Sequence, residues 1–203
     1  TEDTISGVVA IGYRALKAQN ASFGLNTAVG AYAGTALTDS TENVFVGYYA
    51  GAALTTGGGT FIGGKAGEHT TTGSSLVAIG KDSLKANTTG SSNVAVGDSS
   101  LAATTTGGSN TALGTNAGDS ITTGGQNVCI GTNAGSTFTT VSHCVYIGKD
   151  SGQNATGNGN TGVGLDSLRG ATGGSNTSLG RGAGEDLTSG SNNLILGAFA
   201  EAS

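Results

Sequence analysis

The chain has 203 residues, of which 39 are glycine and none is proline, methionine or tryptophan; 10% are charged and the net charge is −5. The glycines follow no triplet, which excludes collagen, and no basic stripe is present, so we expect no nucleic-acid partner. No apolar run approaches the roughly 20 residues of a membrane span, so we expect no membrane insertion. Since methionine is missing, we expect a trimmed start or a segment of a longer chain.

The dominant feature is an aliphatic residue followed by glycine, which recurs at a nearly constant spacing along the chain. A fixed period of this kind is typical of one supersecondary unit stacked many times. We therefore expect residues 1–203 to form a single repeat array. Its coils are anchored on Gly12, Gly30, Gly47, Gly63, Gly80, Gly97, Gly114, Gly131, Gly148, Gly164, Gly180 and Gly197.

Each repeat begins with a short apolar run such as Val-Ala-Ile, which predicts a strand of three or four residues before the glycine. Four residues before the glycine, eight of the twelve repeats carry Asn, and stacking predicts an amide ladder of these side chains. The residues are Asn26, Asn43, Asn93, Asn110, Asn127, Asn160, Asn176 and Asn193. We expect the aliphatic residue before the glycine to form a second ladder in the core, as at Ile79, Val96, Leu113, Ile130 and Ile147.

After the glycine come two variable residues, then Ala or Ser, and then Gly or Leu in eleven of the twelve repeats. We interpret this part as a second short strand that leads into a turn rich in Thr, Gly and Ser. The fold class predicted is all-β: a parallel β-solenoid, or β-roll, of about twelve coils of about 17 residues. At the spacing of paired strands, the rod is roughly 55–60 Å long.

Two or three inward apolar residues per coil make a thin core, which barely offsets the entropy of ordering the whole coil. The chain therefore predicts burial of a second face against identical chains. Small residues recur two before and three after the glycine, and they fit a close seam between chains. We expect a homotrimer, either intertwined or side by side.

Catalytic and cofactor motifs are weak. Residues 59–66 are one residue shorter than the motif of a phosphate-binding loop. Residues 157–162 match a dinucleotide-binding motif, but we expect them to lie in a turn that no helix follows. We interpret His69 and His143 as exposed turn residues, and we expect Cys129 and Cys144 to be free thiols. The sequence predicts no enzyme, no cofactor and no metal.

Aromatic side chains concentrate near the N-terminus. Tyr13, Tyr32, Tyr48 and Tyr49 follow the corner glycine by one or two residues, in columns that carry charged residues in later repeats. These tyrosines are therefore expected to face solvent and are the candidate surface-binding residues, for a sugar ring or a protein partner.

The motif Asn-(Thr/Val)-Ala-(Val/Ile)-Gly-x-x-(Ala/Ser)-Gly, present at residues 26–34, 110–118 and 127–135, resembles two groups of repeats. One is the repeat array of phage tail and capsid fibres, and the other is the head repeat of trimeric autotransporter adhesins. The resemblance covers nearly the whole chain. It implies a trimeric β-solenoid fibre that binds host surfaces, and an extracellular place on a virion or a cell.

The function expected is therefore a non-enzymatic structural fibre or adhesin segment for attachment to a cell surface, either phage fibre-like or bacterial adhesin-like. The alternative is an ice-binding solenoid that presents a threonine array. Its column would be Thr56, Thr72, Thr89, Thr106, Thr123 and Thr140.

Overall fold

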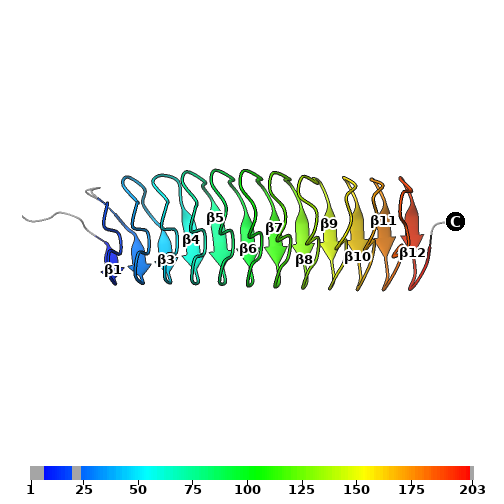
Figure 1. Ribbon diagram of the computed structural model, residues 1–203, viewed down its shortest axis with the longest axis horizontal. Coiled ribbons are helices and arrows are strands. Elements are labelled where there is room, and N and C mark those ends of the chain that lie inside the picture. The colour runs from blue at the N-terminus through cyan, green and yellow to red at the C-terminus, as the bar shows by residue number, and fades with distance from the viewer. Residues whose placement is uncertain (1–6, 20–23, 202–203) are drawn as a thin grey trace, which may run out of the picture.

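The computed structural model describes residues 7–19 and 24–201, and they form a parallel β-solenoid (Figure 1). Each strand pairs in parallel with the next one in the chain, so all twelve lie in one sheet in chain order. Ala95, for example, pairs with Ala112, the equivalent residue of the next coil. The predicted all-β solenoid is confirmed, together with its coil length. The strands are β1 (Val9–Ile11), β2 (Thr27–Val29), β3 (Val44–Val46), β4 (Gly59–Ile62), β5 (Leu76–Ile79), β6 (Val94–Val96), β7 (Thr111–Leu113), β8 (Val128–Ile130), β9 (Val145–Ile147), β10 (Thr161–Val163), β11 (Thr177–Leu179) and β12 (Leu194–Leu196).

The glycine at the end of each strand is required by two features of the corner. Gly80 has a φ of +130°, a conformation that residues with a Cβ rarely adopt. A Cβ added there would also lie 2.4 Å from the carbonyl oxygen of Gly97 in the next coil. The corner glycines therefore stack too closely for any side chain.

The segment that follows the glycine is a series of turns, so the prediction of a second strand was wrong. The second and fourth residues after the glycine adopt left-handed conformations, as at Asp82 (φ +56°) and Leu84 (φ +48°). These bends prevent an extended chain. The coils are still joined here by backbone hydrogen bonds, since Leu84 N donates to Ser100 O at 3.0 Å. We call this part of each coil the return segment.

Among the described residues there is no helix long and apolar enough to cross a membrane.

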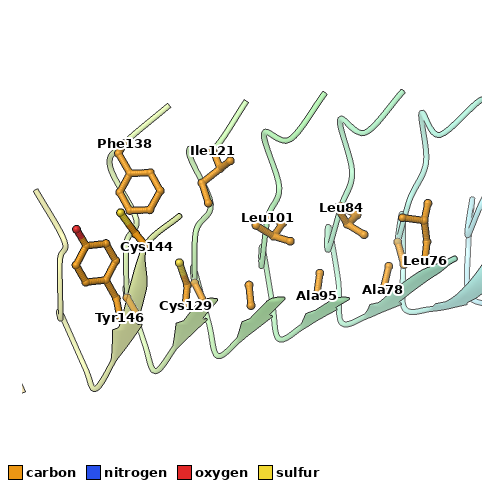
Figure 2. Packing of buried hydrophobic residues seen from close by; sticks show 14 of the residues in the cluster. Leu76, Ala78, Leu84, Ala95, Leu101, Ile121, Cys129, Phe138, Cys144 and Tyr146 are labelled. Carbon is orange, nitrogen blue, oxygen red and sulfur yellow. The ribbon is translucent and has the colours of Figure 1, made fainter. Parts of the chain in front are cut away.

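The core lies between the sheet and the return segment (Figure 2). From β2 to β12, the residue two before the corner glycine points inward, as Ala78 and Ala95 do in Figure 2, and in β5 Leu76 is buried as well. The small residues predicted to form a seam between chains, such as Ala28 and Ala33, are fully buried inside their own coil. That part of the assembly prediction was therefore wrong.

The return segment supplies the rest of the core from the third, fourth and seventh residues after the glycine. The seventh-residue column was not recognised in the sequence because its residue type varies from coil to coil. It includes Leu54, Thr70, Ile121 and Phe138, all buried. With this column the core is thicker than the sequence indicated, and a thin core no longer argues for association between chains.

The aliphatic ladder lies on the outer face of the sheet, which corrects its predicted place in the core. Successive residues of a strand point to opposite faces, so a buried middle residue forces its two neighbours outward. Ile79, Val96 and Ile130 are half-buried, whereas Leu113 and Ile147 are 38% and 37% exposed.

The asparagines four residues before the glycine form a buried hydrogen-bonded ladder. Asn93 Oδ1 accepts a bond from Asn110 N at 2.9 Å, and Asn110 Oδ1 accepts one from Asn127 N at 3.1 Å. Asn110 Nδ2 in turn donates to Gly124 O at 3.0 Å. Each amide therefore satisfies backbone groups of its neighbouring coil that would otherwise be buried without partners.

Candidate functional site

The largest unpartnered feature is the outer face of the sheet, which we call the sheet face. It consists of the first and last residues of the three-residue runs that precede each glycine, and these form two parallel columns along the row of strands. The first column holds Val and Thr, with Leu194 at its end, and the second holds only Val, Ile and Leu. None of these side chains is fully buried, and Ile11, Leu179 and Leu196 are at least half exposed.

Within the twelve described strands, no charged residue occupies either column of the sheet face. The charges gather instead on the return segment. There Lys149 donates to Asp150 and Lys85 contacts Asp82 at 3.2 Å. At Asp82 burial is the largest single influence and raises the pKa, but Lys85 and Lys81 together hold it below its usual value; at Asp150 the bond from Lys149 lowers the pKa against a smaller effect of burial. The sheet face is therefore uncharged, whereas the return segment carries charged side chains.

The four predicted tyrosines come together in one cluster over the first three coils. The ring of Tyr32 contacts Tyr13 edge-on at 5.4 Å between centroids and lies 4.6 Å from Tyr49. Tyr48 packs edge-on against Tyr49 at 4.5 Å, and the guanidinium of Arg14 lies 5.2 Å from the Tyr13 ring centre. Tyr13 and Tyr48 are exposed, whereas Tyr32 and Tyr49 are half-buried by their neighbours.

A shallow groove of about 230 Å³ adjoins this cluster. It is lined by Thr35, Tyr49, Ala52, Ala53, Glu68 and His69. Glu68 Oε2 lies 3.9 Å from His69 Nε2, and the Glu68 side chain is only 15% exposed, against 60% for His69. Sequence reasoning missed this site and treated His69 as an isolated turn residue. Residues 52 and 53 are a pair of adjacent alanines, but the same pair recurs at residues 102 and 103, so it did not mark a site in the sequence.

The cysteines are free thiols buried in the core. Burial raises the pKa of Cys129 to about 12, and it also raises the pKa of Cys144. His143 is exposed in the turn before the ladder column, far along the array from His69. Across residues 7–19 and 24–201, no three His, Cys, Asp or Glu side chains gather closely enough to hold a metal ion.

The threonines of the ice-binding alternative lie in the polar turns. Five of the six exposed threonines, all except Thr140, follow a second threonine whose hydroxyl donates to a carbonyl of the next coil, as Thr88 Oγ1 does to Thr105 O at 2.9 Å. The exposed column is Thr56, Thr72, Thr89, Thr106, Thr123 and Thr140.

Comparison of the chain with protein-family models, with curated proteins and with solved structures finds no match. The repeat motif, the sheet face, the tyrosine cluster and the groove are therefore the features from which a function can be inferred.

Proposed function

We propose that the protein is a non-enzymatic structural segment of an attachment fibre, which associates with copies of itself into a homotrimer and is displayed outside the cell, on a virion or a bacterial surface. The observation that carries the proposal is the uncharged sheet face, which runs the length of the solenoid.

The sheet face is large for a surface in contact with water. Twelve strands at about 4.8 Å, with two outward side chains about 7 Å apart, make a strip on the order of 500 Å² once the width of the side chains is included. That is at the upper end of the apolar patches that soluble monomers leave exposed, and larger patches mark interaction surfaces. The strip carries no charge along its length, and its second column is wholly aliphatic, so it suits a partner that is equally long and uncharged.

A second copy of the chain has these properties. Chains related by cyclic symmetry bring like surfaces to a common axis, and a coil spacing shared by every copy keeps the ladders in register along the axis. Ile79 and Val77 of each chain would then pack on the same residues of its partners. The resemblance of the repeat motif to trimeric fibre repeats favours three chains around the axis.

Support for attachment comes from the tyrosine cluster. Tyr13, Tyr32, Tyr48 and Tyr49 gather on the first three coils, while later coils carry mainly charged and small polar residues in the same columns, with Leu165 and Phe199 as exceptions. Aromatic side chains supply large contact area with a polar tip, which suits recognition of glycans or proteins. The remaining coils then act as a spacer that is rigid because every coil pairs with the next.

Sedimentation of the Ile79→Asp variant tests the proposal. We expect the unmodified protein to sediment with a mass near three times 19.4 kDa. The Ile79→Asp variant should sediment as a monomer of 19.4 kDa, because a charge on the sheet face cannot be buried unpaired between chains. Its circular dichroism spectrum should remain that of an unchanged β-structure. The matched control is Thr89→Asp, which adds the same charge on an exposed turn and should remain trimeric.

A monomeric unmodified protein would contradict the proposal. If that monomer also shows thermal hysteresis in freezing solutions, the exposed threonine column or the sheet face binds ice, and the alternative function holds.

A further inference from the structure

We propose that the groove beside Tyr49 binds one neutral pyranose ring of a surface glycan. This inference rests on the proposed attachment function and names the ligand class of that surface. It adds Glu68, His69 and Thr35 to the tyrosines as recognition residues.

The groove lies where two small residues, Ala52 and Ala53, precede the longer Glu68 and His69 of the next coil, with the ring of Tyr49 nearby. Ala52 and Ala53 are the fifth and sixth residues after their corner glycine; Thr35 precedes them in one column, and Glu68 and His69 follow them in the next coil. Tyr49 closes one side. A volume of about 230 Å³ lies just below the range of drug-sized pockets, roughly 300–1,000 Å³. It therefore suits a single ring rather than a chain of rings.

The lining has the two chemistries that a sugar ring presents. The alanine methyl groups and the tyrosine ring offer an apolar floor and wall for the C–H face of a pyranose. The Glu68 carboxylate offers acceptors to hydroxyl groups, and His69 and Thr35 offer donors and acceptors at the rim. The backbone is already occupied, since Ala53 N donates to Glu68 O at 3.1 Å and His69 N donates to Lys85 O at 3.1 Å. Recognition therefore falls to the side chains.

The charge of the groove selects a neutral ring. Glu68 is the lining carboxylate, and its side chain is largely buried, so its field on a ligand in the groove is weakly screened. An anionic sugar would place a second negative charge beside it. Hydrogen bonds to a charged acceptor are stronger than neutral ones, which gives Glu68 the largest share in orientation of the ring.

The groove lies across the core from the sheet face, because it is built on the return segment. In this coil the return segment packs directly against the inner face of the sheet, since a Cβ added at Gly51 of the return segment would lie 2.4 Å from the ring of Phe45 on β3. A trimer formed through the sheet face thus leaves three grooves open to solvent. Three weak sites on one particle raise the overall avidity for a multivalent surface.

Saturation-transfer NMR with methyl β-glucopyranoside and methyl β-galactopyranoside at millimolar concentration tests the inference, with the methyl glycoside of N-acetylneuraminic acid as the anionic probe. We expect at least one neutral probe to bind and the anionic probe not to bind. Ala53→Asn should abolish the signal by filling the groove, and Glu68→Gln should weaken binding roughly tenfold.

The matched control is Ala103→Asn, in the same column two repeats beyond His69. Asn154 occupies that column in a later coil, so both substitutions suit the fold. No signal from either neutral probe, equal binding of the anionic probe, or binding that survives Ala53→Asn would overturn the inference. Sedimentation of the same samples separates the two proposals, because loss of the trimer contradicts the fibre proposal alone.

Discussion

The ring of Phe45 fills the space that Gly51 leaves empty, since a Cβ added at Gly51 would meet the ring carbons at 2.4 Å. Phe61 faces Gly67 and Tyr146 faces Gly152 in the same way, at 2.3 Å. Where the strand residue is alanine, as at Ala78 and Ala95, the facing residue is Leu84 or Leu101 in Figure 2. At this pair of facing positions, these coils therefore place a large side chain either on the strand or on the return segment, and not on both.

This relationship predicts a compensating pair in β5. Leu84→Gly should cost roughly 2–5 kcal/mol by leaving a cavity, and Ala78→Phe should cost about 1–3 kcal/mol by overpacking. Together they recreate the arrangement of Phe45 and Gly51. We expect the double variant to be at least about 2 kcal/mol more stable than the sum of the single effects implies. Urea unfolding at one protein concentration measures this, and additive costs would show that the two positions do not share one space.

The asparagine ladder predicts a loss of stability that depends on position. Asn110→Ala removes bonds to Asn127 N and Gly124 O, and leaves both backbone groups buried without partners. We expect a cost of about 2–4 kcal/mol in the free energy of unfolding. Asn193→Ala is the matched control, because Asn193 lies at the end of the ladder and is half-buried, and it should cost about 1 kcal/mol or less. Equal costs at both sites would contradict a role for the ladder.

The buried thiols predict a pH effect of known sign. The pKa of Cys129 rises to about 12 on folding, from about 8.5 in an unfolded chain. Since the folded state disfavours the thiolate, this stability is present below about pH 8.5 and is lost as the pH rises toward about 12. At pH 8 we expect no reaction of the native protein with Ellman's reagent, and two thiols after unfolding in urea. Fast reaction of the native protein would mean that the core opens at that coil.

The tyrosine cluster predicts where attachment is lost. Replacement of Tyr13, Tyr32, Tyr48 and Tyr49 by serine should abolish binding to a glycan microarray and leave the circular dichroism spectrum unchanged. Serine is compatible with the left-handed conformation there, since Ser99 occupies the same column with a φ of +55°. The control replaces Lys81 and Asp82 by serine in equivalent columns of a later coil. Binding that survives the tyrosine change places the contact elsewhere on the chain.

The sequence by itself determined the period, the strands and the asparagine ladder. Asn93 precedes β6 and Gly97 follows it, so only three residues remain for the strand. A constant period along the chain then predicts that equivalent residues of successive coils stack on one another. Which side of that strand is buried was decided by tertiary structure. Val94 and Val96 are more hydrophobic than Ala95, so the sequence favoured the wrong face. Only the return segment, bent by left-handed residues such as Ser99 and Leu101, brings a large side chain against the strand and leaves room there for alanine alone.

The candidate site likewise has one part that the sequence predicts, the tyrosines, and one part that only the structure shows, the groove. The tyrosines were visible in the sequence because they occupy columns that are charged elsewhere, and a shared column in stacked coils is a shared surface. The groove was not visible, because Tyr49 lies in a different column from Ala53 and His69, and the three residues come from two coils. They meet only when the return segments stack at the distance set by the glycine corners, where the backbones of successive coils touch.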